Sequence, residues 1–173
     1  MRTLTAIDGT PVPLPDPDRL VHLQFRRFAG CPICNLHLRS IVARHDQIEA
    51  AGLREVVVFH SPTEELLVHA GDLPFAVIAD PRRHLYREYG VESAPRSLLH
   101  PGAWPGMVRG SIALLRRGDR PPPLRVAGGR LGLPGDFLIA PDGTHLASKL
   151  GVHANDQWSV DELLSLVPKE VHP

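Results

Sequence analysis

Residues 20–38 read LVHLQFRRFAGCPICNLHL and contain both cysteines of the 173-residue chain, Cys31 and Cys34. The first part, residues 20–28, is rich in apolar and β-forming side chains and predicts a strand. Over residues 32–50 apolar side chains recur at helical spacing, which predicts a helix. The stretch therefore predicts a strand that turns into a helix at two closely spaced thiols.

The sequence that follows alternates between strands and helices. Continuous apolar runs at residues 54–60 and 74–80 predict two further strands that are covered on both faces. Between them, the Ser-Pro-Thr-Glu sequence at 61–64 predicts a helix that begins with a capping box. Asp80, followed by Pro81, is expected to cap another short helix. This alternation indicates βαβ units and a parallel sheet.

The second half of the chain has a different pattern. Residues 91–131 are rich in Pro, Gly and Arg and hold one helical segment, 107–117. Residues 136–151 predict a β-hairpin around a Pro-Asp-Gly turn. Ser159, with Glu162 three residues later, predicts the capped start of a last helix.

The order of these elements, βαβ followed by a β-hairpin and a helix, is typical of the thioredoxin-like fold. We therefore expect one α/β domain over residues 1–173, with residues 91–131 as an insert of about 40 residues before the hairpin. Residues 9–18, which contain four prolines, are expected to be extended or looped.

Composition excludes several classes of function. The chain has 19 Lys and Arg against 19 Asp and Glu, and no basic run with interleaved aromatic residues, so a nucleic-acid partner is not expected. No apolar run approaches the roughly 20 residues of a membrane span, and the start of the chain lacks the apolar segment of a signal peptide. We expect a cytoplasmic protein without a membrane partner, in which a lone cysteine pair is catalytic or metal-binding rather than a structural disulfide.

The cysteine spacing favours redox chemistry. If the helix begins at Pro32, Cys31 is its N-cap, where unpaired N–H groups and the helix dipole stabilise a thiolate and lower the thiol pKa. Cys34 then lies one turn further along, and the two sulfurs can approach closely enough to form a disulfide. No cofactor is needed for this chemistry.

Two other interpretations of the pair remain open. A zinc half-site would take His37 as a third ligand, but structural zinc normally needs four ligands and no second Cys/His pair is visible, so no metal is expected. Alternatively, both cysteines are simply small buried side chains; Pro32 between them argues against this interpretation but does not exclude it.

Several neighbouring side chains are candidates for tuning the thiols or binding substrate. Arg26 or Arg27 can face a thiolate, unless both are an ordinary charged strand end. His37, three residues after Cys34, can tune or protonate a thiol, although a solvated His is the more common case.

Other candidates lie at the same edge of the predicted sheet. His60 and Ser61 end the second strand, and the capping role already accounts for Ser61. Pro134 begins the hairpin, where a cis proline would pack against the disulfide, although trans is the default for X–Pro bonds.

Three segments resemble a known family. Residues 74–91, PFAVIADPRRHLYREYGV, and residues 136–143, DFLIAPDG, are similar to the peroxiredoxins of the alkyl hydroperoxide reductase and thiol-specific antioxidant family. Residues 25–34, FRRFAGCPIC, are similar to a peroxiredoxin-like subgroup that contains a CxxC pair. The resemblance covers about residues 20–90 and 132–166.

This resemblance implies a function. It implies a thioredoxin fold in which a cysteine thiol reduces a peroxide or related small oxidant, an intramolecular disulfide closes, and a thioredoxin-type dithiol regenerates the enzyme. It also implies that two copies of the chain pair into a homodimer. Alternatives are a general thiol-disulfide oxidoreductase, or a redox-sensing binding module whose apolar insert residues form a lid or interface: Trp104, Met107, Ile112, Leu114 and Leu115.

The sequence departs from the classical peroxiredoxins at two positions. They have Thr-x-x-Cys, so Cys34 aligns with their attacking cysteine and Cys31 with their threonine. Their peroxide-holding arginine aligns with Pro134, and an arginine of this chain that could substitute is Arg26, Arg27, Arg96 or Arg109. The helix-terminus argument favours Cys31 as the attacking sulfur and the resemblance favours Cys34. We therefore expect Cys31 to attack in disulfide exchange and Cys34 to attack peroxides, with an intramolecular disulfide as the product in both cases.

Overall fold

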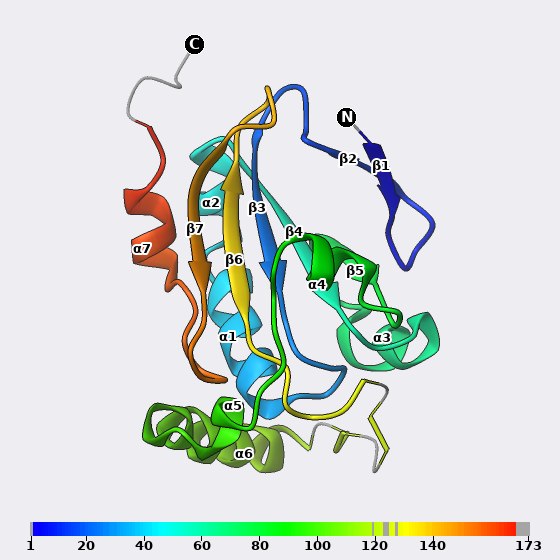
Figure 1. The fold of residues 1–173 in the computed structure, drawn as a ribbon, viewed down its shortest axis with the longest axis vertical. Helices are drawn as coiled ribbons and strands as arrows, with labels where there is room; N and C mark the ends of the chain where they lie inside the picture. Colours follow the sequence, from blue (N-terminus) through cyan, green and yellow to red (C-terminus); the bar gives the residue numbers. More distant parts are fainter. Residues whose placement is uncertain (1, 119, 123–124, 127, 169–173) are drawn as a thin grey trace.

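The computed structural model describes residues 2–118, 120–122, 125–126 and 128–168. Its main sheet has five strands in the order β5-β4-β3-β6-β7 (Figure 1). The strands are β3 (Leu20–Phe25), β4 (Leu53–Phe59), β5 (Ala76–Ala79), β6 (Gly135–Ile139) and β7 (His145–Leu150). β3, β4 and β5 are parallel, while β6 runs antiparallel to β3 and pairs with β7 as a hairpin. The α/β thioredoxin-like fold is confirmed.

Helices cover both faces of this sheet. One face carries α1 (Pro32–Val42), α2 (His45–Ala50), α3 (Thr63–Ala70) and α7 (Val160–Ser165), whose apolar side chains pack on β3, β4 and β6. The other face carries α4 (His84–Glu88) and the amino-terminal residues. These residues form a small hairpin of β1 (Arg2–Thr5) and β2 (Pro11–Leu14), where the sequence predicts only an extended or looped chain.

The helix predicted over residues 32–50 is two helices. Arg44 leaves helical geometry, with φ −125° and ψ 21°, and separates α1 from α2. Its guanidinium donates to Gln47 and, at 2.6 Å, to Asp161 of α7. A contact with a distant segment therefore accompanies the break, which local periodicity does not reveal.

The capping predictions have mixed outcomes. Ser159 and Glu162 form the predicted capping box of α7. The Asp80 carboxylate accepts the N–H groups of the first turn of α4, at 2.9 Å and 2.8 Å, as a cap of this short helix should. The capping box at Ser61 is wrong, because α3 begins at Thr63 without a side-chain cap. The Ser61 hydroxyl is buried and accepts the backbone N–H of Ala29 instead, at 3.0 Å.

The predicted insert contains three helical segments, α5 (Arg96–Leu99), η1 (Pro101–Ala103) and α6 (Trp104–Arg117). α6 lies across the end of the sheet where α1 begins (Figure 1). Two glycines permit this close approach. A Cβ at Gly110 would lie 2.6 Å from the carbonyl oxygen of Pro32, and one at Gly106 would lie 2.6 Å from the Asn155 side chain. Among the described residues, no helix is long and apolar enough to cross a membrane.

Candidate active site at the Cys31–Cys34 pair

Cys31 occupies the N-cap of α1, and Pro32 is the first residue of the helix, as the sequence predicts. The Cys31 Sγ accepts the backbone N–H of Cys34 at 3.5 Å. Both thiols are free, and they are 0% and 2% exposed. The pair is thus a reduced dithiol held at the positive end of a helix.

The two thiols have opposite electrostatic environments. Burial raises the pKa of Cys31, but a hydrogen bond from Cys34, the charge of Arg27 and backbone N–H groups outweigh it and lower the pKa to about 6. Burial and the adjacent Cys31 sulfur raise the pKa of Cys34 well above its ordinary value. At neutral pH this arrangement gives a Cys31 thiolate beside a protonated Cys34.

Arg27 is the arginine that faces the thiolate. Its Nη1 lies 3.6 Å from Cys31 Sγ, and its Nη2 donates to the backbone carbonyl of Arg130. The guanidinium also lies over the Phe28 ring, 5.2 Å from the centroid. These contacts hold a buried positive charge against the Cys31 sulfur.

Replacing Arg27 with methionine should raise the Cys31 pKa, because the nearest positive charge is removed while burial remains. Because the Cys31 pKa is about 6, a rise of one unit would lower the thiolate fraction at pH 7 from about nine-tenths to about one-half. The rate of iodoacetamide alkylation, measured against pH, gives this pKa directly. Arg39→Met is the matched control, since Arg39 lies on the same helix with its side chain 44% exposed. An unchanged pKa in Arg27→Met would mean that Cys34 and the helix terminus lower the Cys31 pKa without help from Arg27.

Arg26 and His37 contact each other rather than the thiols. The Arg26 guanidinium donates to Asp136 at 2.6 Å and to Gln24 at 2.8 Å, and lies 3.0 Å from Nε2 of His37. His37 is buried, so the interpretation of a solvated histidine is wrong. Burial and the charge of Arg26 lower its pKa well below the ordinary value. His37 is therefore neutral and accepts a hydrogen bond from Arg26.

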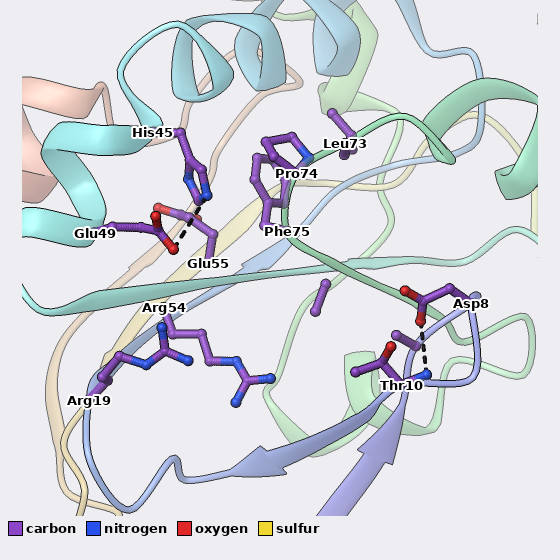
Figure 2. A pocket seen from close by; sticks show the side chains of 12 residues that line it. Asp8, Thr10, Arg19, His45, Glu49, Arg54, Glu55, Leu73, Pro74 and Phe75 are labelled. Carbon is purple, nitrogen blue, oxygen red and sulfur yellow. Dashed lines mark hydrogen bonds and ion pairs between the residues drawn. The ribbon is translucent and has the colours of Figure 1, made fainter.

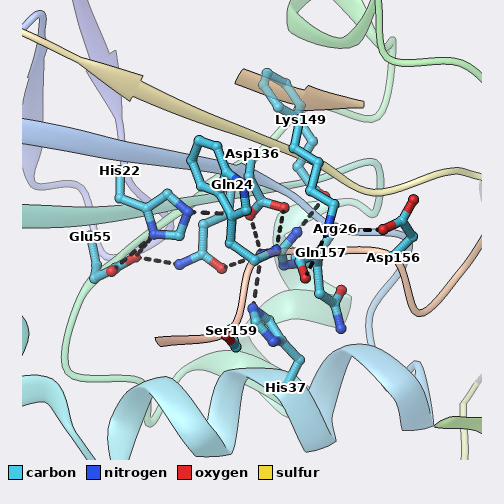
Figure 3. Close-up of polar contacts among 12 residues, drawn as sticks. His22, Gln24, Arg26, His37, Glu55, Asp136, Lys149, Asp156, Gln157 and Ser159 are labelled. Carbon is cyan, nitrogen blue, oxygen red and sulfur yellow. Dashed lines mark hydrogen bonds and ion pairs between the residues drawn. The ribbon is translucent and has the colours of Figure 1, made fainter. Parts of the chain in front are cut away.

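Arg26 belongs to a buried polar network that the sequence analysis does not predict (Figure 3). Here "the buried network" means six buried residues: His22 and Gln24 of β3, Arg26 directly after β3, His37 of α1, Glu55 of β4 and Asp136 of β6. His22 bonds to Glu55 at 2.9 Å and to Asp136 at 3.2 Å, and Gln24 donates to Glu55. The signal in the sequence is the alternation of three polar residues, 22, 24 and 26, within the predicted strand over residues 20–28.

Charge within the buried network is balanced. Burial lowers the His22 pKa, but Glu55 and Asp136 outweigh it and raise that pKa to about 9. For Asp136, burial raises the pKa, and Arg26 together with His22 lowers it well below its ordinary value. Two cations therefore face two carboxylates in the interior.

The remaining predicted residues lie around the same sheet edge. His60 is buried, with its ring 5.7 Å from that of Tyr86 and 6.4 Å from that of Phe28. Pro134 directly precedes β6. The first residue of β6, Gly135, pairs with Phe25, the last residue of β3, so Pro134 lies at the edge of the sheet where β3 ends. Its ring packs against Gly151.

The peptide bond before Pro134 is trans, so the cis proline considered at this position is not found. Among the described residues, the only cis peptide bond joins Leu14 and Pro15. Of the other candidate arginines, Arg96 pairs with Glu92 at the surface, at 2.9 Å, and Arg109 is exposed on α6.

The part of the chain that the structure describes has no group of three or more His, Cys, Asp or Glu side chains placed to hold a metal ion. A cavity of about 340 Å³ lies at the opposite edge of the sheet, where β4 and β5 begin (Figure 2). Its lining includes Arg54, Glu55 and Ala76, so it is not the site next to the cysteines.

Comparison with known proteins decides the family. The profile of the AhpC/TSA antioxidant enzymes matches residues 40–150, well over half of the chain. The chain belongs to this family. The matched range begins after the cysteine pair, so the assignment does not depend on the CxxC sequence of this AhpC/TSA protein. A search of curated protein sequences gives no match.

Solved structures give the same fold. Peroxidoxin BcpB from Mycobacterium tuberculosis aligns with a TM-score of 0.65 and 14% identity, over 99% of this chain and 94% of the other. A protein described as thiol:disulfide interchange protein DsbE from Chlorobium tepidum aligns with a TM-score of 0.60 and 19% identity, over 96% and 93%. StoA from Bacillus subtilis aligns with a TM-score of 0.59 and 15% identity, over 96% of both chains. At these identities the likeness concerns the fold.

Proposed function

We propose that this AhpC/TSA family protein reduces peroxides through attack by Cys31 and closure of a Cys31–Cys34 disulfide. The observation that carries the proposal is the lowered pKa of Cys31, to about 6, beside Arg27 at the start of α1. Cys34, protonated and one turn further along, supplies the second thiol.

The reaction has two steps. The Cys31 thiolate attacks one oxygen of the hydroperoxide, the O–O bond breaks, and the leaving alkoxide takes a proton, giving an alcohol and a sulfenic acid. The Cys34 sulfur then attacks the sulfenic sulfur, water leaves, and the disulfide forms. A thioredoxin-type dithiol returns both electrons, and its own thiols become a disulfide.

Treatment with one equivalent of hydrogen peroxide tests the proposal. Both thiols should be lost together, and the monomer mass should fall by about two hydrogens, as thiol oxidation to a disulfide requires. Circular dichroism before and after treatment checks that the fold persists. A rate no faster than that of free cysteine, with the fold intact, would contradict peroxide reduction.

A second candidate is a thiol-disulfide oxidoreductase. It is supported by Pro134, which stands where classical peroxiredoxins have their peroxide-holding arginine, and by the CxxC pair. Reduction of insulin or of a mixed-disulfide substrate distinguishes the two. In both cases Cys31 is the nucleophile and a dithiol donor restores the pair.

A further inference from the structure

α6 exposes a continuous row of large apolar side chains, here called the α6 stripe. Its members are Trp104, Val108, Ile112 and Leu115, which are 55%, 58%, 43% and 77% exposed. Spacings of four, four and three residues place them on one face of the helix. Met107, which the sequence analysis also assigns to a lid or interface, packs instead against the core cluster that contains Cys31 and Cys34. The insert thus has an apolar face that its own fold leaves uncovered.

The opposite face of α6 is fixed. Gly106 and Gly110 are buried, and a Cβ at Gly110 would meet the Pro32 carbonyl. The helix cannot rotate to bury the α6 stripe without putting a larger side chain into this contact. Exposure of the stripe is therefore a consequence of how α6 packs on α1.

Positive charge accompanies the α6 stripe. Arg109 and Arg116 are exposed to one side of the stripe on the same helix, and neither forms an ion pair with any residue that the structure describes, whereas Arg117 lies on the face of Gly110. Residues 93–118 contain four arginines and no acidic residue, although the whole chain has equal numbers of both charges. The segment that carries the apolar face thus has a net positive charge, although the whole chain has none.

We propose that the α6 stripe docks onto the surface of an anionic lipid bilayer. A helix with tryptophan and aliphatic side chains on one face and arginine beside it has the pattern of an interfacial helix, with the apolar side chains at the acyl boundary and the arginines at the phosphates. A second copy of this chain fits less well, because facing stripes would bring the arginines of both copies together without an acidic partner. The expectation of no membrane partner rests on the lack of a membrane-spanning run, and neither that lack nor the finding that no described helix could cross a membrane bears on binding to the bilayer surface.

Docking in this way would bring the dithiol close to the bilayer. The α6 stripe and Gly110 lie on opposite sides of one helix, and Gly110 touches Pro32, between the two cysteines. The pair would lie about one helix diameter, roughly 10 Å, from the lipid surface. Membrane binding itself does not depend on the chemistry of the cysteines. A vesicle-binding assay therefore tests this proposal independently of the proposed peroxide reduction.

Sedimentation with lipid vesicles tests the proposal. The protein should bind vesicles of phosphatidylcholine and phosphatidylserine, bind pure phosphatidylcholine less, and lose affinity as salt is added. Ile112→Glu should weaken binding by about tenfold or more, because an apolar contact with lipid is lost. Changing Arg109 and Arg116 to glutamine should weaken it by about fivefold per arginine.

Leu146→Glu is the matched control, because Leu146 is 42% exposed but lies on β7, away from α6. It should bind anionic vesicles as the wild type does. Three results would overturn the proposal: no binding of the folded wild type to anionic vesicles, equal losses in Ile112→Glu and Leu146→Glu, or a wild-type dimer that Ile112→Glu converts to a monomer. The last result would assign the α6 stripe to a second copy of the chain.

Discussion

Replacing Cys31 with serine should abolish the reaction with peroxide and with disulfide substrates, by about a thousandfold or more. Serine keeps the N-cap hydrogen bond to the helix, so the fold should persist. It does not ionise at neutral pH, whereas the Cys31 pKa is lowered to about 6. Mass spectrometry after a short peroxide pulse should show no sulfenic acid and no disulfide.

Cys34→Ser is the variant to compare with Cys31→Ser, because it keeps the proposed attacking thiol and removes the second one. Cys31 keeps Arg27 and the helix terminus, so the first step should proceed and a Cys31 sulfenic acid should accumulate. Dimedone, which traps sulfenic acids, should label this variant and leave Cys31→Ser unlabelled. The opposite pattern would show that the classical peroxiredoxin alignment, with attack by Cys34, overrides the geometry at the start of α1.

Removing the Asp136 carboxylate should produce a large loss of stability. Asp136→Asn leaves Arg26 and His22 buried without their shared carboxylate, and breaking a buried charge pair in this way typically costs about 3–5 kcal/mol. Urea unfolding, followed by circular dichroism, measures the change in free energy of unfolding.

An exposed ion pair provides the control. Asp161 lies 2.6 Å from Arg44, but its side chain is 84% exposed, so Asp161→Asn should cost less than about 1 kcal/mol. Equal effects of the two substitutions would mean that the buried network contributes specificity rather than stability. Alkylation of Cys31 should be unchanged in folded Asp136→Asn, since Arg27, not Arg26, faces the thiolate.

The pH dependence of stability should follow the same residues. The His22 pKa is raised from 6.5 to about 9 in the folded protein, so its contribution is complete below about pH 6.5 and is lost as pH rises through about 9. The Asp136 pKa is lowered from 3.8, so its contribution is present above that value and is lost as pH falls below it. Wild-type stability should therefore be greatest between these limits, and Asp136→Asn should weaken the dependence on both sides.

Local sequence patterns predict most of the fold. The parallel strands, the closing hairpin and the capped last helix depend on short-range periodicity and turn chemistry, which operate within a few residues. The same holds for Cys31 at the N-cap, because Pro32 defines the first turn of α1. Errors occur where a distant partner intervenes. Ser61 does not cap its own helix because its hydroxyl binds Ala29.

The sequence by itself determined that this chain is a thioredoxin-like protein with a dithiol at the start of a helix. Only the tertiary structure decided which arginine faces the thiolate, because Arg26 and Arg27 are adjacent and the strand end directs one to Asp136 and the other to Cys31. It also decided the difference between the two thiols, since burial and neighbouring charges from several elements set their pKa values. The spacing of the cysteines supplies a redox pair, and packing around it assigns each sulfur a different protonation state.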